Sequence, residues 1–178
     1  FRDIRGIFLA VAPDGSALAT AELASRALSV TNAQTGGTSR LPVAGDYTWI
    51  RGLDWSPDGA RIAVLTSEGE GRRLHWLARD TGRLGVIAED VGQVDGIRWA
   101  PAGDAVYYLK VSGLSRELWK VPVDGDGASP GLPVAVQSGL QAGPHFSLSR
   151  TSDHTAGFSM LSNPRWAMAQ SRLSRWTI

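Results

Sequence analysis

The chain has 178 residues, 43% of them hydrophobic and 20% charged, and its formal net charge is +1. This is the composition of an ordinary globular domain, and the balanced charge gives no sign of a nucleic-acid or anionic-membrane partner. Cysteine is absent, which excludes disulfide bridges, thiolate nucleophiles and cysteine-ligated metals. Because no apolar run approaches the roughly 20 residues of a membrane helix, we expect no membrane insertion by this segment.

The N-terminal residues, Phe1 to Phe8, do not read as a signal peptide and do not begin with methionine. We therefore expect the chain to be a segment of a longer protein. The absence of cysteine does not determine the compartment, because a chain without thiols is stable in reducing and oxidising surroundings alike.

A turn motif recurs along the chain. It reads Ala-Pro-Asp-Gly at Ala12–Gly15, Ser-Pro-Asp-Gly at Ser56–Gly59 and Ala-Pro-Ala-Gly at Ala100–Gly103, with successive prolines 44 residues apart. Proline sets φ for the first turn position, and glycine accepts the positive φ that the returning chain needs. A fourth, degraded copy stands 49 residues further on, at Phe146–Asp153. A fixed period of this length indicates a repeat architecture.

Alternating apolar residues around each turn predict four strands per repeat. The first repeat has strands through Leu9 and Val11, at Ala17–Ala21, at Ala27–Asn32 and ending near Leu41. The second has strands through Leu53 and Trp55, at Arg61–Thr66, at Arg72–Arg79 and ending near Ala88. The third has strands through Ile97 and Trp99, at Ala105–Lys110, at Glu117–Val123 and ending near Val136. The fourth has strands through Phe146 and Leu148, at Thr155–Met160 and at Arg165–Gln170.

Four short antiparallel strands in every 40 to 50 residues describe a β-propeller blade. We therefore predict an all-β fold with four four-stranded blades, at approximately 1–43, 44–89, 90–138 and 139–178. No stretch has a sustained helical period with capping residues, so we expect almost no helix.

The segment Leu53–Val64, with Trp-Ser-Pro-Asp-Gly followed by Arg-Ile-Ala-Val, resembles the TolB-like propeller repeat. Leu118–Val121 is similar to the third strand of that repeat, and the resemblance covers essentially the whole chain. Two departures stand out: Val11 occupies the place of the usual tryptophan, and Arg150–Ser152 replaces the Pro-Asp-Gly turn in the fourth repeat.

The resemblance implies a ring of six or more blades, so four blades would form part of a six- to eight-bladed ring. Three arrangements are open: further blades in the parent chain, two chains closing an eight-bladed ring as a homodimer, or four blades closing alone. The resemblance also favours a periplasmic or extracytoplasmic location.

No catalytic motif is present: there is no Gly-x-Ser-x-Gly, His-Glu-x-x-His, phosphate-binding loop or dinucleotide fingerprint. His75 aligns with Trp119 at a third-strand position and is interpreted as structural, whereas His145 and His154 have no metal-ligand spacing. Asp124–Gly127 lacks the further oxygen ligands of a calcium loop. We predict no catalytic residue, no metal and no cofactor in this segment.

Most of the seven tryptophans recur with the repeat and are predicted to pack between blades. Trp49 is the exception, because it lies in the segment leading into an innermost strand. Such segments gather at one mouth of the central channel, where aromatic and arginine side chains favour binding. The predicted binding rim comprises Tyr47, Trp49, Arg51, Gln93, Asp95 and His145.

These features predict a binding or scaffolding module for a protein or peptide partner, or for a small ligand at the mouth. By resemblance, the nearest analogues are sensor or interaction domains of bacterial receptor kinases and regulators. A second hypothesis is the gating propeller of a prolyl oligopeptidase-like serine peptidase with its catalytic domain elsewhere. A third is an envelope scaffold protein of the TolB type.

Overall fold

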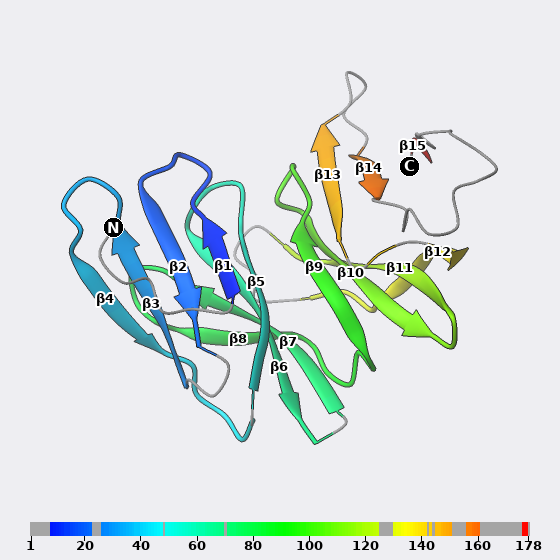
Figure 1. Ribbon diagram of the computed structural model, residues 1–178, viewed down its shortest axis with the longest axis horizontal. Coiled ribbons are helices and arrows are strands. Elements are labelled where there is room, and N and C mark those ends of the chain that lie inside the picture. Colours follow the sequence, from blue (N-terminus) through cyan, green and yellow to red (C-terminus); the bar gives the residue numbers. More distant parts are fainter. Residues whose placement is uncertain are drawn as a thin grey trace.

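The computed structural model describes residues 8–22, 26–47, 49–69, 71–124, 130–141, 143, 145–150, 156–160 and 176–177. Within these residues all regular structure is β and no helix occurs. Three four-stranded antiparallel sheets follow one another along the chain, and a three-stranded sheet comes last (Figure 1). The all-β prediction is confirmed.

Hydrogen-bonded neighbours follow chain order in every sheet. Sheet one contains β1 (Phe8–Val11), β2 (Ala17–Ala21), β3 (Ala27–Asn32) and β4 (Thr38–Pro42). Sheet two contains β5 (Trp49–Trp55), β6 (Arg61–Glu68), β7 (Gly71–Ala78) and β8 (Leu84–Ala88). Sheet three contains β9 (Val94–Trp99), β10 (Ala105–Ser112), β11 (Ser115–Pro122) and β12 (Val134–Leu140). Sheet four contains β13 (Phe146–Arg150), β14 (Ala156–Met160) and β15 (Trp176–Thr177).

Some strands extend beyond their predicted ends, because their hairpins are longer than the alternation of apolar residues indicated. β6 and β10 each continue two residues beyond their predicted ends, because the chain reverses only at Gly69 and Gly113, which have φ of 57° and 59°. β12 runs to Leu140 rather than ending near Val136. The third strand predicted at Arg165–Gln170 lies outside the described residues, and the strand that pairs with β14 here is β15.

The recurring turns are built alike in the first three sheets. In each, the glycine N–H donates to the carbonyl oxygen three residues earlier at 2.9 Å, and its φ lies between 70° and 79°. In the first two copies the turn aspartate, Asp14 or Asp58, also accepts a backbone N–H two residues ahead at 2.9 Å. Local backbone chemistry therefore accounts for the motif.

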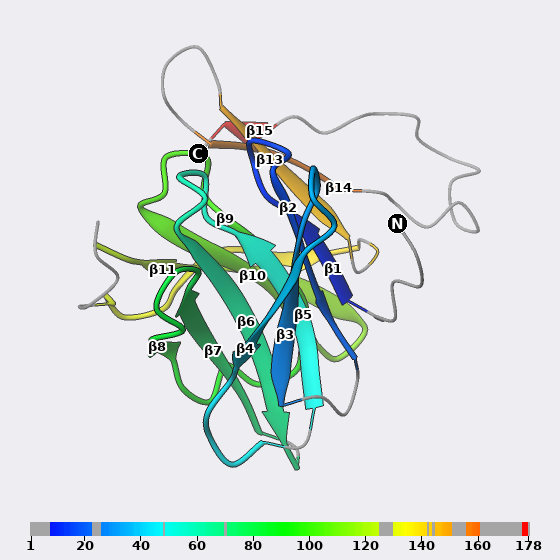
Figure 2. The same ribbon diagram turned by 90° about the vertical axis from the view of Figure 1, so that its left-hand side faces the viewer.

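The first strand of each sheet lies on the inner side, with β1 beside β5 and β5 beside β9 (Figures 1 and 2). Apolar cores fill the spaces between the sheets. Trp55 belongs to the core between sheets one and two, and Trp99 to the core between sheets two and three; their exposed fractions are 6% and 5%. The prediction that these two tryptophans occupy equivalent buried positions is confirmed.

Gly85 on β8 lies directly against the indole of Trp76, and a Cβ at this position would overlap the ring. Gly85→Ala should therefore lower the free energy of unfolding by about 1 to 3 kcal/mol, as overpacking does. Gly52→Ala is the matched control, because its Cβ would meet Ile97 Cγ1 at an ordinary 3.6 Å. Urea denaturation of both variants measures the effect, and equal stability of the two would contradict the packing described.

Candidate functional site

The inner strands of sheets two and three each contain a β-bulge at the same repeat position. The register of β5 on β6 shifts after Ile50, which leaves Arg51 as the extra residue. The register of β9 on β10 shifts in the same way, and the extra residue is Asp95. A bulge re-aims its side chain and recurs beside functional sites. Arg51 and Asp95 are thus released from the ladder at one end of neighbouring strands.

This end of the molecule also holds the segment before β5, the β6–β7 hairpin and the segment between β8 and β9, at the lower edge of Figure 1. Trp49 pairs with Ser67 across β5 and β6. Arg51 Nε donates to Ser67 Oγ at 3.3 Å, and the guanidinium carbon lies 5.9 Å from the centroid of the Trp49 ring. Arginine at this distance from an indole makes a cation–π contact.

Arg72, at the start of β7, connects sheet two with the inner strand of sheet three. Its Nη1 donates to the carbonyl oxygen of Val94. Burial lowers the pKa of Arg72, the nearby Arg51 lowers it further, and Asp95 opposes both. Arg72 therefore lies close enough to Arg51 and Asp95 for their charges to change its pKa.

Asp95 forms an ion pair with Arg116 on β11: its Oδ2 lies 2.7 Å from Nη2 and accepts from Nε at 2.8 Å. We call Trp49, Arg51, Arg72, Asp95 and Arg116 the mouth cluster. The cluster presents three guanidinium groups, one carboxylate and one indole from two neighbouring sheets. Arginine and tryptophan are the side chains that most often dominate binding at protein interfaces.

The six predicted rim residues do not all come together. Trp49 is half-buried, Arg51 and Asp95 are exposed, and the charges of Arg51 and Asp95 both act on the pKa of Arg72. Gln93 is exposed two residues before Asp95, and His145 is exposed next to β13. Tyr47 is only 5% exposed, and its hydroxyl donates to the Val43 carbonyl oxygen at 2.9 Å. The Tyr47 hydroxyl is therefore already hydrogen-bonded within the fold and is not free to bind a partner.

Arg72 and Arg116 were missed by the sequence analysis. Ser67 on β6 pairs with Trp49 on one side and with Arg72 on the other. The predicted strand ended at Thr66, so it did not include Ser67 and did not bring Trp49 and Arg72 together. Arg116 forms its ion pair with the residue at the bulge of β9, and the apolar pattern predicts no bulge there. The one sequence feature that points to this site is the pair of arginines, Arg72 and Arg73, directly after the turn region at Ser67–Gly71.

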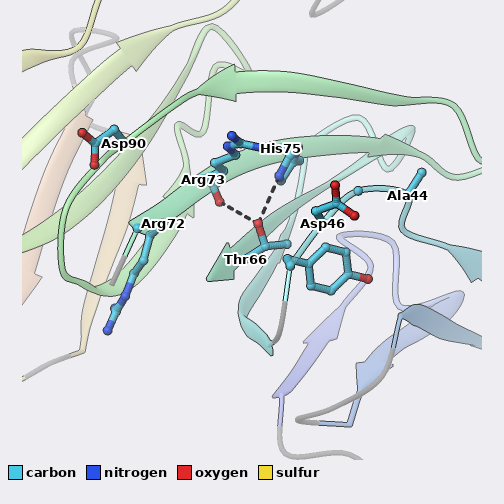
Figure 3. Close-up of a pocket in the computed structure, with 10 residues that line it drawn as sticks. Ala44, Asp46, Thr66, Arg72, Arg73, His75 and Asp90 are labelled. Carbon is cyan, nitrogen blue, oxygen red and sulfur yellow. Dashed lines mark hydrogen bonds between the residues drawn. The ribbon is translucent and has the colours of Figure 1, made fainter. Parts of the chain in front are cut away.

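Arg72 also lines a cavity of about 230 Å³ that adjoins the cluster. The cavity is lined by Ala44, Gly45, Asp46, Tyr47, Thr66, Gly71, Arg72, Arg73, His75 and Asp90. Figure 3 shows the Thr66 hydroxyl between His75 and the backbone of Arg73: Oγ1 is 3.1 Å from Nε2 and donates to the carbonyl oxygen at 3.5 Å.

Burial of the His75 ring, helped by Arg73, lowers its pKa from 6.5 to about 4. The ring is therefore neutral near pH 7. Its Nδ1 has no hydrogen-bond partner within the described residues. His75 is thus a buried, neutral side chain that lines the cavity.

Asp54 is an ionisable group on β5 that the sequence analysis did not select. Its Oδ2 accepts the backbone N–H of Trp99 at 2.6 Å and so joins sheets two and three. Burial raises the pKa of Asp54 from 3.8 to about 6, although this hydrogen bond and the charge of Arg98 oppose the rise. Asp54 thus titrates close to the physiological range.

No group of three or more histidine, cysteine, aspartate or glutamate side chains in the described part of the chain could hold a metal ion. Within the same residues no helix has the length and apolar character needed to span a membrane. The loop at Asp124–Gly127 and His154 lie largely or wholly outside the described residues.

Successive four-stranded sheets with their first strands innermost are the blades of a β-propeller, and similar solved structures support this fold. No protein-family model matches the chain, and no match was found among curated proteins. TolB from Acinetobacter baumannii is similar with a TM-score of 0.61 and 15% identity, over 97% of this chain and 41% of that one.

Hydrazine synthase from Kuenenia stuttgartiensis is similar with a TM-score of 0.59 and 18% identity, over 94% of this chain and 47% of that one. A nidogen/laminin complex matches with a TM-score of 0.61 and 15% identity, over 86% of this chain and 56% of that one. The chain thus spans about half the length of these structures. At such identities the likeness concerns the fold alone.

Proposed function

We propose that this chain is a non-catalytic binding segment of a β-propeller, and that the mouth cluster is its contact surface for a protein or peptide partner. The observation that carries the proposal is the pair of equivalent bulges at Arg51 and Asp95, near the same end of neighbouring inner strands. Repeated bulges on neighbouring inner strands place side chains from two blades in one surface.

The cluster is organised before any partner arrives. Arg51 is held by Ser67 and Trp49, Arg72 by the Val94 carbonyl oxygen, and Asp95 by Arg116. Side chains that are already ordered lose little conformational entropy on binding, which favours affinity. An indole and guanidinium groups suit a peptide or protein surface that offers carbonyl oxygens, carboxylates and apolar side chains.

The recurring turn motif, which reads Trp-Ser-Pro-Asp-Gly at Trp55–Gly59, and the likeness to TolB together support a TolB-like propeller as the finer identity. Among its roles we propose a sensor or protein-interaction part of a larger bacterial protein, such as a receptor kinase or regulator, in the periplasm or outside the cell. A protein partner is also supported by the similarity to a nidogen structure solved in complex with laminin.

Replacing Trp49 and Arg51 together by alanine should weaken partner binding at least about tenfold, because aromatic and arginine anchors dominate interface energies. The change should cost less than about 1 kcal/mol of stability, since Trp49 is half-buried and Arg51 exposed. The measurement is quantitative affinity capture from an extract of the source organism, followed by calorimetry with the captured partner.

The matched control replaces Arg40 and Val86, an exposed arginine and an exposed apolar residue on the outer strands β4 and β8. It should bind like the wild type. If the Trp49 and Arg51 variant retained the same partner with the same affinity, the mouth cluster would not be the contact surface.

A further inference from the structure

The cavity beside the mouth cluster has buried polar side chains in its lining. Thr66 and His75 are 1% and 7% exposed, and their side chains are 3.1 Å apart across β6 and β7. Buried polar groups are nearly always hydrogen-bonded, because an unmet donor or acceptor costs free energy. His75 Nδ1 nevertheless has no partner within the described residues. The cavity is therefore a polar site with an incompletely bonded lining, and not a gap in apolar packing.

Arg73 lies on the same face of sheet two as these two side chains. It is paired with Thr66 across β6 and β7, and His75 follows it by two residues on β7. Side chains two residues apart in a strand point to the same face. Arg72 belongs to the opposite face, where it donates to the Val94 carbonyl oxygen, and Figure 3 shows its side chain directed away from His75. Arg73 is thus the guanidinium that faces the cavity.

The Arg73 guanidinium has no counter-ion among the described residues. Arg73 is exposed, and its side chain forms neither a hydrogen bond nor an ion pair with any of them. The two carboxylates of the lining, Asp46 and Asp90, are exposed and form no ion pair there either. Arg73 therefore offers an unoccupied fork of N–H donors at the cavity, and this fork matches the two oxygens of a carboxylate.

The positive charge of Arg73 also acts on the buried part of the lining. After burial, Arg73 is the next largest influence on the pKa of His75, and it lowers this pKa more than Glu89 raises it. At Arg72 a positive neighbour likewise outweighs a negative one. An anionic group is the complement that such a positive field attracts.

We propose that the cavity is a subsite for a carboxylate group of the partner, which pairs with the Arg73 guanidinium beside Thr66 and His75. The carboxylate belongs to an acidic side chain or to the C-terminus of the partner. This inference rests on the proposed function, because the cavity adjoins the mouth cluster at Arg72. Asp46 and Asp90 oppose an anion, but solvent and salt weaken the field of exposed charges, whereas a guanidinium–carboxylate pair adds two direct hydrogen bonds.

An NMR titration of the protein expressed from its own gene, with isotope-labelled histidine rings, tests this inference. Three peptides are the probes: N-acetyl-Gly-Glu-Gly-amide has an acidic side chain, N-acetyl-Gly-Gly-Gly a free C-terminal carboxylate, and N-acetyl-Gly-Gln-Gly-amide no charge. The His75 signal is identified by its loss in His75→Gln. A carboxylate peptide should shift this signal saturably and raise the pKa of His75 above about 4, because a bound anion offsets the charge of Arg73.

Arg73→Gln is the test variant, and Arg40→Gln, which changes an exposed arginine on β4, is its matched control. Arg73→Gln should weaken binding of the carboxylate peptides at least about tenfold, because it removes the charge-assisted pair, and Arg40→Gln should bind like the wild type. Binding of one carboxylate peptide alone assigns the source of the group, and binding of both supports the shared chemistry. An equal response to the neutral peptide, no response to any peptide, or unchanged binding by Arg73→Gln would overturn the proposal.

The proposed function is judged separately from the subsite. Trp49 and Arg51 do not line the cavity, so the variant with both replaced by alanine should bind the carboxylate peptides as the wild type does. Failure of the peptides to bind, with partner binding still weakened in that variant, would overturn the subsite alone. Retained partner affinity in that variant would instead contradict the mouth cluster as the contact surface, whatever the peptides do.

Discussion

Replacing Trp55 by alanine should lower the free energy of unfolding by about 3 to 5 kcal/mol, the range for truncating a large buried aromatic side chain. The indole fills the space between sheets one and two, and its Nε1–H bonds the Ala10 carbonyl oxygen at 2.9 Å. The variant therefore leaves both a cavity and a buried carbonyl without its donor. Equilibrium denaturation in urea measures the loss.

Trp99→Ala should cost a similar amount through the cavity it leaves between sheets two and three. Its Nε1 has no hydrogen-bond partner within the described residues, so its loss should fall nearer the lower end of the range. Trp55→Phe keeps a buried six-membered ring but removes the pyrrole part of the indole together with the hydrogen bond, so its stability should lie between that of the wild type and that of Trp55→Ala. Trp49→Ala is the control outside these cores. Unchanged stability of both the Trp55 and Trp99 variants would mean that the repeat register is wrong.

The second large effect concerns pH. The pKa of Asp54 rises from 3.8 to about 6 on folding, so the folded protein holds this proton more tightly than the unfolded chain. Stability from Asp54 is therefore present below about pH 4 and is lost as pH rises through 6. A shift of this size corresponds to roughly 3 kcal/mol.

His75 acts in the opposite direction. Its pKa falls from 6.5 to about 4 on folding, so the unfolded chain holds the proton more tightly. Stability from the neutral ring is present above about pH 6.5 and is lost as pH falls toward 4, again by roughly 3 kcal/mol. Between pH 4 and 6 the two groups therefore nearly cancel in the wild-type protein.

Single substitutions should reveal the two opposing changes of stability with pH, one from Asp54 and one from His75. Asp54→Asn retains an acceptor for the Trp99 N–H and removes the carboxyl titration, so stability should rise with pH between 4 and 6. His75→Gln removes the ring titration, so stability should fall with pH over the same range. Urea midpoints at several pH values measure the slopes, and a double variant should be flat. Equal slopes in both single variants would contradict the assignment.

Much of the fold follows from short-range patterns. The Pro-Asp-Gly turns, the strands beside them and the buried positions of Trp55 and Trp99 were all predictable. Proline and glycine restrict φ within one turn, and alternation sorts the side chains of one strand to two faces. Each of these effects acts over a few residues, so it can be recognised without knowing the partner strand.

The candidate site was predictable only in part. Trp49, Arg51 and Asp95 were indicated by their place before or within the inner strands, but Arg72 and Arg116 come from third strands. Their approach depends on hairpin lengths and on two bulges, which the apolar pattern does not encode. Tyr47 is buried in the core between sheets one and two, where its hydroxyl donates to the Val43 carbonyl oxygen, and neither contact has a sequence signature.

The sequence by itself determined the repeat, the four-strand unit, the turns and the tryptophans that pack between the sheets, because these depend on backbone φ preferences and on strand periodicity. Tertiary structure alone decided which charges meet at the mouth, how far the pKa of Asp54 and His75 shift, and why Leu9 is exposed while Leu53 is buried. The reason is that burial and charge pairing depend on which sheet stands opposite, and that neighbour lies tens of residues away in the chain.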